Sequence, residues 1–337
     1  MSKQINIAIN GFGRIGRAVF KIILEKYPHY KIVAINDLTD TKTLAHLLKY
    51  DTVYGTYSAS VSSDEKNIIV NRKKTPVLSE KDPSLLPWAK MKVDLVLECT
   101  GRFTKKEDLE LHLKAGAKKV ILSAPAKGDK KVKTIVLGVN EKKIDKKKDQ
   151  ILSCASCTTN CLAPVTNIVK EKFGIKKALL STVHAYTADQ NLVDGPHRDL
   201  RRARSAALNI VPTSTGAASA INDTIPSLKG TFDGLAIRVP VVTGSMCDIV
   251  FHLKKKTTIE EISNTFIKAS VNKRYKGLVE VSNGALVSSD IIGNNHSSIV
   301  DLPMTRLIGG DLLKLIVWYD NEWGYASRLA DLIKYLV

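Results

Sequence analysis

The chain has 337 residues, of which 44% are hydrophobic and 25% are charged. This composition excludes a disordered chain, and the length exceeds what one small core usually needs, so we expect two folded domains. No apolar run reaches the roughly 18 to 20 residues that cross a bilayer. The N-terminus MSKQINIAIN enters a strand pattern without a separate signal region, which favours a cytoplasmic protein.

Basic residues outnumber acidic ones by 51 to 33, which gives a formal net charge of +18. Such an excess attracts anions, whether phosphorylated metabolites, nucleic acid or acidic lipid headgroups, and its sign alone does not choose among them. The lysine run KKIDKKK at 142–148 is typical of a solvated face. Aromatic residues make up 6% of the chain and do not alternate with basic ones, so nucleic-acid or surface binding is expected only as a secondary role.

The five cysteines are odd in number, and Cys154, Cys157 and Cys161 lie within eight residues. This arrangement suits a reducing compartment and local chemistry better than a disulfide framework. Cys154 and Cys157 have the spacing of a redox dithiol or of half a zinc site. Because no second cysteine pair and no histidine pair completes four ligands, we expect no metal.

The first half of the chain alternates short β-branched runs with amphipathic segments. We expect helices at 14–26 and near 105–115, and strands at 5–9, 31–35, 94–101, 119–122 and 134–139. Strands that alternate with helices form a parallel sheet covered on both faces. The sequence therefore predicts an α/β fold with a Rossmann-type doubly wound parallel sheet domain over residues 1–153.

The second half has longer strands. After a helix that begins at about Cys157, we expect strands at 177–186, 234–242, 245–253 and 312–320 and a helix at 258–272. This pattern predicts an α+β domain with a mostly antiparallel sheet over residues 154–321. A final helix at about 322–337 is expected to pack back onto the first domain.

Gly11, Gly13 and Gly16 follow the first strand with the spacing G-x-G-x-x-G, and a helix follows them. The first glycine allows a tight turn, the second lets a pyrophosphate approach the backbone, and the third lets the helix pack closely on the strand. Asp37 ends the next strand, where a carboxylate accepts hydrogen bonds from ribose hydroxyls and repels a 2'-phosphate. These features predict a dinucleotide site that prefers NAD to NADP.

Cys157 lies in ASCTTNC at the expected start of a helix, where the helix dipole lowers the pKa of a thiol. Ser156 and Thr158 flank it and offer hydroxyl and backbone donors to an anion. His184 ends a strand in STVHAYT. A histidine alone there is typical of a buried structural residue, but together with the cysteine it predicts a nucleophile and its base.

Nine segments together resemble one family over essentially the whole chain. They are INGFGRIGR, NDL, ECTGRF, ILSAPAKGD, ASCTTNCLAP, VHAYTADQ, RRARSAALNIVPTSTGAA, IRVPV and WYDNEWGY, and they resemble glyceraldehyde-3-phosphate dehydrogenase. The segments TADQ and RRARSAAL resemble its bacterial and organellar branch more than the animal cytosolic one.

The resemblance implies a glycolytic enzyme that converts glyceraldehyde 3-phosphate, inorganic phosphate and NAD to 1,3-bisphosphoglycerate and NADH. Cys157 would attack the aldehyde to give a thiohemiacetal, and His184 would accept the hydroxyl proton as hydride leaves for the nicotinamide. Loss of hydride would leave a thioester on Cys157, which inorganic phosphate would attack to release 1,3-bisphosphoglycerate. The family implies a homotetramer, in which the segment 185–208 resembles a loop that lies across subunits beside the cofactor.

The resemblance also assigns binding residues by their positions. Expected cofactor contacts are Asn10, Gly11, Phe12, Gly13, Arg14, Ile15, Asp37, Lys81, Thr100, Ser123 and Asn321, and Pro196 is typical of members that prefer NAD. The pocket for the substrate's own phosphate is expected at Thr187, Asp189, Arg202 and Arg238. The pocket for the attacking phosphate is expected at Ser156, Thr158, Thr215 and Gly216. Arg238 lies in the apolar run LAIRVPV, where an unpaired charge is costly, so it should have a ligand.

Three positions depart from the family pattern. Cys154 stands where asparagine is expected, Cys99 where serine is common, and Lys81 where many relatives have arginine. A second thiol near Cys157 raises the hypothesis of a disulfide or of protection from over-oxidation. Erythrose-4-phosphate dehydrogenase, a paralogue with the same cysteine and histidine, remains an alternative, although the STG and SCT segments favour bound inorganic phosphate.

Overall fold

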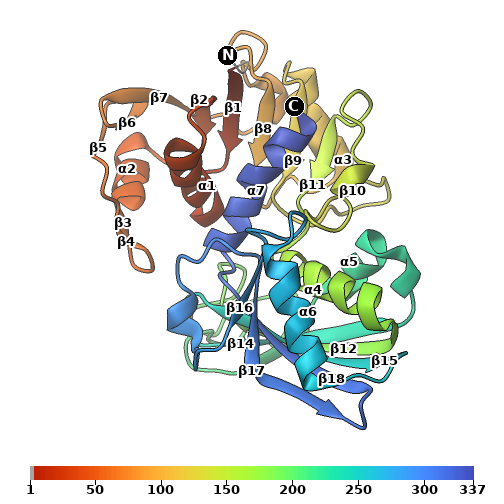
Figure 1. The fold of residues 1–337 in the computed structure, drawn as a ribbon. Coiled ribbons are helices and arrows are strands. Elements are labelled where there is room, and N and C mark those ends of the chain that lie inside the picture. Colours follow the sequence, from red (N-terminus) through yellow and green to blue (C-terminus); the bar gives the residue numbers. More distant parts are fainter. Residues whose placement is uncertain (1–3) are drawn as a thin grey trace. The chain divides into compact units, whose positions relative to one another are not determined.

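The computed structural model describes residues 4–337 and divides into two compact units. Unit 1 comprises the chain up to Ile135 together with Lys142–Ala155 and Ala326–Val337. Unit 2 comprises Val136–Glu141 and Ser156–Tyr325. Figure 1 shows the elements of both units, coloured along the chain. The expected fold class is confirmed, because one unit has a largely parallel sheet and the other a mostly antiparallel one.

Unit 1 contains a nine-stranded sheet with the order β10-β11-β9-β8-β1-β2-β7-β6-β5. Neighbouring strands are parallel except for the pairs β7–β6 and β6–β5. All four residues of β8 are buried, as expected for a central strand covered on both faces. The strands are β1 (Ile5–Asn10), β2 (Tyr30–Asn36), β5 (Val61–Ser63), β6 (Asn67–Val70), β7 (Lys73–Leu78), β8 (Leu95–Glu98), β9 (Lys119–Leu122), β10 (Lys133–Thr134) and β11 (Ile151–Ser153), with a separate pair β3 (Tyr50–Asp51) and β4 (Gly55–Thr56).

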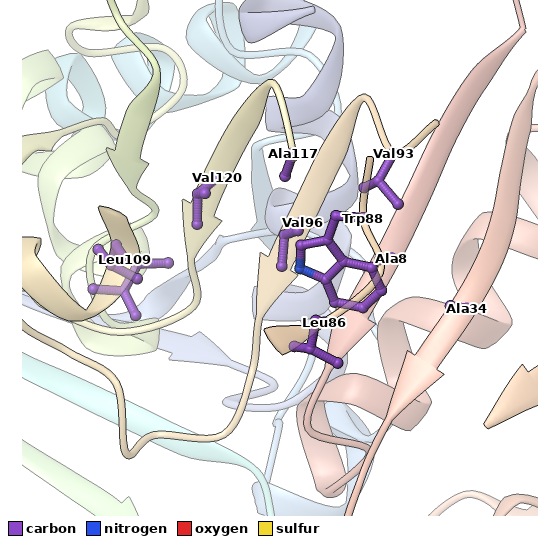
Figure 2. Close-up of a cluster of buried hydrophobic side chains, with 10 residues drawn as sticks. Ala8, Ala34, Leu86, Trp88, Val93, Val96, Leu109, Ala117 and Val120 are labelled. Carbon is purple, nitrogen blue, oxygen red and sulfur yellow. The ribbon is translucent and has the colours of Figure 1, made fainter. Parts of the chain in front are cut away.

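The helices of unit 1 are α1 (Arg14–Lys26), α2 (Thr41–Lys49), α3 (Lys106–Lys114) and most of α7 (Trp323–Leu336). A core cluster gathers around the fully buried Trp88, with Ala8 of β1, Val96 of β8 and Leu109 of α3 among its members (Figure 2). Two contacts hold α7 within the unit. The Tyr27 hydroxyl donates to Asp331, and Lys146 Nζ donates to the Lys334 carbonyl at 3.0 Å.

Unit 2 contains a seven-stranded sheet with the order β13-β14-β12-β15-β18-β17-β16. Four of its six neighbour pairs are antiparallel, and the pairs β12–β14 and β16–β17 are parallel. Burial alternates strictly along β15, so one face of that strand faces the core. The strands are β12 (Ile175–Ala185), β13 (Val211–Ser214), β14 (Phe232–Val239), β15 (Ser245–Leu253), β16 (Val279–Ser282), β17 (Ser298–Ile308) and β18 (Leu312–Tyr319).

The helices of unit 2 are α4 (Cys157–Phe173), α5 (Ala217–Thr224) and α6 (Ile259–Val271). At the start of α4 the Ser156 side chain accepts a hydrogen bond from the Thr159 amide at 3.0 Å, which is the usual role of a serine N-cap. Gly174 ends α4 with φ at +70°. Short 3₁₀ turns complete the chain at Pro83–Leu85, Glu141–Lys143, Pro226–Leu228 and Ser288–Ile291.

The expected strand at 134–139 is wrong. Only Lys133–Thr134 form β10, and the chain then turns because Gly138 has φ at +80° and the Asn140 side chain accepts from the Val136 amide at 2.8 Å. An apolar run alone does not distinguish a strand from a buried turn. The helices α2 and α5 and the strands β5–β7 and β17 are further elements that the sequence pattern did not identify.

Candidate active site

The glycine-rich turn between β1 and α1 has the backbone geometry that its sequence requires. Gly11 has φ at +91°, and a Cβ there would lie 2.7 Å from the Thr100 amide nitrogen. A Cβ on Gly16 would lie 2.2 Å from the Gly11 carbonyl oxygen. Gly13 differs, because no atom lies within 4 Å of the position of its Cβ. Only glycine therefore fits at positions 11 and 16, and position 13 leaves its backbone open to an approaching group.

A cavity of about 330 Å³ lies beside this turn within unit 1. It is lined by Asn10, Gly11, Gly13, Asn36, Asp37, Leu38, Glu80, Lys81, Cys99, Thr100, Arg102 and Phe103. These residues follow the carboxyl ends of β1, β2, β7 and β8, where ligands bind in open α/β sheets. Helix α1 begins at the turn, and no side chain caps its N-terminus. Its first amides are therefore available to an anion.

Asp37 connects the end of β2 to the glycine-rich turn. Its Oδ2 accepts from the Phe12 amide at 2.7 Å, and its Oδ1 accepts from the Thr39 amide at 3.0 Å. The carboxylate also lines the cavity. Asp37 thus fixes the turn and presents negative charge to the cavity at the same time.

Six of the eleven expected cofactor residues line this cavity, and five do not. Those that line it are Asn10, Gly11, Gly13, Asp37, Lys81 and Thr100. The Phe12 ring is fully buried against Phe20, so only its backbone faces the turn. Arg14 pairs with Asp51 at 2.8 Å, and Ile15 is half-buried in the first turn of α1. The Ser123 amide donates to the Glu98 carbonyl at 2.9 Å.

Asn321 belongs to unit 2 and is held by three donors. Its Oδ1 accepts from Ser245 Oγ at 2.9 Å, and from Thr243 Oγ1 and the Gly244 amide at 3.2 Å each. Because its oxygen is occupied, the amide is fixed in orientation, and its NH₂ group is the part that can serve a ligand. A role in holding the cofactor carboxamide stays a prediction.

Cys157 and His184 lie together in unit 2. Cys157 is the first residue of α4, and its Sγ lies 3.4 Å from Nε2 of His184 near the end of β12. The ring of His184 contacts Tyr319 edge to face, with centroids 5.9 Å apart. Ala155, two residues before the cysteine, has φ at +57°, a conformation that costs a residue with a side chain about 1–2 kcal/mol. The structure therefore brings together the two residues expected to perform catalysis.

The electrostatics of the pair differ from the simple expectation of a lowered thiol pKa. Burial raises the pKa of Cys157, and the charge of Arg238 and hydrogen bonds from Thr158 offset only part of this effect. Burial, aided by the charge of Arg238, lowers the pKa of His184 to about 3. Burial therefore disfavours both the thiolate and the imidazolium.

Arg238 lies beside His184 because β14 and β12 are parallel neighbours in which these two residues are paired in register. Arg238 Nη1 lies 2.8 Å from His184 Nδ1 and donates to the Ala185 carbonyl at 2.9 Å. His184 Nδ1 lies 2.7 Å from the same carbonyl. When Nδ1 donates to that carbonyl, Nε2 turns its lone pair toward the sulfur, which is the form that accepts a proton.

The four residues expected to bind the substrate phosphate form one connected cluster in unit 2. Arg238 Nη1 donates to Thr187 Oγ1 at 3.3 Å, Thr187 donates to Asp189, and Arg202 pairs with Asp189. Although burial opposes its ionisation, Asp189 has a lowered pKa because Thr187 donates to it and Arg238 and Arg202 are close. Arg238 Nε is buried without a hydrogen-bond partner among residues 4–337. This open donor supports the expectation that Arg238 has a ligand.

The other expected phosphate residues lie at two helix N-termini. Ser156 caps α4, and Gly216 precedes α5 without a side-chain cap. Thr215 Oγ1 accepts from the Ala217 amide at 3.2 Å. Thr158 is buried, and its hydroxyl bonds to the Tyr319 hydroxyl at 2.9 Å, so its side chain faces the interior.

Tyr319 is a site residue that the sequence reasoning did not single out. Its buried hydroxyl also bonds to Thr182 Oγ1 at 3.0 Å and thereby connects β18 and β12 beneath the cysteine and histidine. Burial raises the pKa of Tyr319 well above its ordinary value. Its position in WYDNEWGY, at the end of an apolar strand, was the feature of the sequence that could have identified it as a site residue.

Cys154 lies in unit 1 and is buried directly after β11, where its amide donates to the Leu122 carbonyl at 3.0 Å. Cys157 belongs to unit 2, and none of the five cysteines, all of which lie in the described residues, forms a disulfide. A redox pairing of Cys154 with Cys157 stays a hypothesis.

The segment 186–210 of unit 2 contains little regular structure and exposes apolar side chains. Leu192, Val193, Leu200, Leu208 and Ile210 are each between 71% and 83% exposed. Gln190, in contrast, is buried, and neither end of its amide has a partner among the described residues. Exposed apolar side chains gathered on one segment are typical of an interaction surface.

Within residues 4–337, no helix is long and apolar enough to span a bilayer. The same part of the chain contains no group of three or more His, Cys, Asp or Glu side chains arranged to hold a metal ion.

Two family models match the chain. Residues 5–106 match the NAD binding domain of glyceraldehyde 3-phosphate dehydrogenase, and residues 156–321 match its C-terminal domain. Three similar proteins are each named glyceraldehyde-3-phosphate dehydrogenase. The Streptomyces coelicolor protein is 52% identical over 97% of both chains, and the Geobacillus stearothermophilus protein is 50% identical over 98% of both. The Borreliella burgdorferi protein is 51% identical over 99% of this chain and 100% of its own. The chain belongs to the glyceraldehyde-3-phosphate dehydrogenase family.

Proposed function

We propose that this protein is a phosphorylating, NAD-dependent glyceraldehyde-3-phosphate dehydrogenase of glycolysis. It would oxidise glyceraldehyde 3-phosphate in the presence of inorganic phosphate to 1,3-bisphosphoglycerate. The observation that carries the proposal is the 3.4 Å contact between Cys157 Sγ and His184 Nε2 beside a cluster of arginines. This combination provides a nucleophile, a base and an anion site within one unit.

The neutral cysteine and histidine suit attack on an aldehyde. As Sγ bonds to the aldehyde carbon, His184 Nε2 accepts the thiol proton, so the thiolate need not exist beforehand in the buried site. His184 Nε2 returns this proton to the developing oxyanion, which gives the thiohemiacetal hydroxyl, and accepts it again as hydride leaves the carbon. Because its Nδ1 lies against the Ala185 carbonyl at 2.7 Å, the ring keeps its orientation during these transfers.

The substrate phosphate is proposed to bind the cluster of Thr187, Arg202 and Arg238. The buried Nε of Arg238 provides a donor with no partner among the described residues, and the guanidinium charges oppose the phosphate charge. Asp189 holds Arg202 in place. The attacking phosphate is proposed to bind near Ser156, Thr158, Thr215 and Gly216, where α4 and α5 present N-terminal amides.

The cavity of unit 1 fits a dinucleotide. Position 13 is open, the N-terminus of α1 has no side-chain cap, and Asp37 faces the cavity. Gly11, Gly13, Asp37, Lys81 and Thr100 would hold NAD, which when bound supplies the hydride acceptor. The charge of Asp37 explains a preference for NAD, because a 2'-phosphate would meet a carboxylate.

The proposal is tested by an absorbance assay for NADH with glyceraldehyde 3-phosphate, run with and without inorganic phosphate. We expect continuous turnover that requires phosphate. A parallel assay with erythrose 4-phosphate should give much slower turnover. Phosphate-independent turnover, or faster oxidation of erythrose 4-phosphate, would contradict the proposal.

We further propose a homotetramer in the cytoplasm. The exposed apolar side chains of segment 186–210 and the buried, unpartnered amide of Gln190 support a second subunit at this surface. Five cysteines of the described residues form no disulfide, which supports a reducing compartment. Sedimentation velocity would measure the assembly, and a monomer at micromolar concentration would contradict it.

A further inference from the structure

A buried polar network crosses the carboxyl ends of three neighbouring strands in unit 1. Glu98 ends β8, Asn10 ends β1 and Asn36 ends β2, and the sheet places these strands side by side. Glu98 and Asn10 are fully buried, and Asn36 is 5% exposed. The cavity proposed for NAD lies at the same strand ends and is bordered by Asn10 and Asn36.

Glu98 lies at the centre of this network and receives four hydrogen bonds. Its Oε1 accepts from the Thr100 amide at 2.8 Å and from the Thr100 hydroxyl. Its Oε2 accepts from Asn10 Nδ2 at 2.6 Å and faces His112 Nε2 at 3.0 Å. A carboxylate offers about four lone-pair positions, so its acceptor capacity is filled.

One end of the network is fixed by Trp88. Its indole Nε1 donates to His112 Nδ1 at 3.0 Å, and an indole nitrogen can only donate. His112 Nδ1 is therefore the acceptor, and Nε2 carries the hydrogen that points to Glu98. The indole cannot turn away, because it is fully buried in the core cluster of Figure 2.

The other end is fixed by the backbone of Glu80. The Glu80 amide donates to Asn36 Oδ1 at 2.9 Å, and Asn36 Nδ2 donates to the Glu80 carbonyl at 2.9 Å. Asn36 Nδ2 also donates to Asn10 Oδ1 at 2.7 Å. A backbone N–H can only donate and a backbone carbonyl can only accept. The side-chain amides of Asn36 and Asn10 therefore each have one allowed orientation. Asn10 must then present its NH₂ group to Glu98.

The Thr100 amide, Asn10 and His112 are thus donors whose direction is set elsewhere, and the Thr100 hydroxyl also donates to Glu98. We propose that ionised Glu98, oriented through His112 and Trp88, is a positioning residue for the NAD cavity. It fixes Thr100, whose amide lies against Gly11 and whose hydroxyl accepts from the Arg102 amide at 3.1 Å. The loops after β1 and β8 are thereby held in the shape that borders the cavity. This inference rests on the proposed NAD site.

Glu98→Gln tests the polarity of the network with almost no change in size. In either orientation of the new amide, its NH₂ group would face another donor. This donor is the Thr100 amide on one side, and Asn10 Nδ2 and His112 Nε2 on the other. We expect the Kd for NAD, measured by calorimetry, to rise about ten- to a hundredfold, which is the effect of losing a buried hydrogen bond to a charged group. The rate at saturating NAD and the alkylation of Cys157 by iodoacetamide should change little.

Asp94→Asn is the matched control. It makes the same chemical change just before β8, at the opposite end of the strand, where Asp94 accepts from the Asn6 amide at 2.9 Å and from Lys118 at 2.7 Å. We expect this variant to bind NAD as the wild type does. An unchanged Kd in folded Glu98→Gln overturns the proposal, as does an equal rise in both variants.

A second pair of variants tests the proposal if Glu98→Gln does not fold. His112→Gln retains an acceptor for Trp88 and a donor for Glu98, whereas His112→Leu retains neither. We expect His112→Gln to bind NAD within about threefold of the wild type and His112→Leu to bind at least about tenfold more weakly. Equal losses in the two overturn the proposal. A wild-type protein that does not bind NAD would instead refute the proposed function, and this inference with it.

Discussion

The lowered pKa of His184 makes a measurable prediction about stability and pH. Burial holds the pKa of His184 at about 3 in the folded protein, against an ordinary value of 6.5 in an unfolded chain. Below pH 6.5 the unfolded state therefore binds a proton that the folded state does not. This difference favours unfolding, so stability at this site is complete above pH 6.5 and is lost as the pH falls toward 3.

The size of the effect follows from linkage. Lowering the pH from 7.5 to 5.5 stabilises an unfolded chain with a histidine of pKa 6.5 by about 1.4 kcal/mol at 25 °C, while the folded state gains almost nothing. His184→Asn removes this contribution. We therefore expect unit 2 of the wild type to lose about 1.4 kcal/mol more stability than the variant over this pH range.

Amide hydrogen exchange of peptides from β12 measures the free energy of opening in unit 2 at both pH values, after correction for intrinsic exchange rates. His252→Asn, at a half-buried position of β15, controls for the chemical change. Equal pH dependence in the wild type and His184→Asn would refute the reasoning. It would show that His184 takes up its proton in the folded state, as in a preformed thiolate and imidazolium pair.

Three other substitutions test the site. Cys157→Ser should abolish oxidation of the aldehyde and leave NAD binding by calorimetry unchanged, because the nucleophile is in unit 2; retained turnover would exclude Cys157 as the nucleophile. Asp37→Asn keeps an acceptor for the Phe12 amide at 2.7 Å but removes the charge, so discrimination against NADP in the NADH or NADPH assay should fall about tenfold, and an unchanged ratio would argue against this position. Tyr319→Phe removes the hydroxyl that bonds to both Thr158 and Thr182, although Thr182 keeps its bond to the Met246 carbonyl, and should cost about 1–2 kcal/mol in chemical denaturation. A change near zero would mean that the lost hydrogen bonds are replaced.

Much of the fold could be predicted because the hydrophobic periodicity and the turn-forming residues agree in its central elements. The apolar run of β8 and the glycines around Gly13 specify their strand and turn locally, and the helices α1 and α4 begin as expected. The strand expected at 134–139 failed because its apolar residues are buried in a turn, which is made possible by Gly138 and the side chain of Asn140. Periodicity does not encode such a side-chain contact.

Some features of the candidate site could likewise be predicted from the sequence, and others could not. The contact between Cys157 and His184 follows from two local patterns, a helix start and a strand end. The raised pKa of Cys157 could not be predicted, because it depends on how deeply the rest of unit 2 buries the sulfur. The network around Glu98 was equally inaccessible, since it joins residues 10, 36, 80, 88, 98 and 112 that only the completed sheet brings together.

The segment 186–210 carries both an exposed apolar surface and three residues of the proposed anion site. Thr187, Asp189 and Arg202 lie on the same irregular stretch as the five exposed apolar side chains. Any subunit contact that covers those side chains also restricts the backbone carrying the three anion-site residues. Subunit assembly and phosphate binding are then thermodynamically linked, so each should strengthen the other. Dilution of the protein should therefore lower its affinity for the aldehyde substrate.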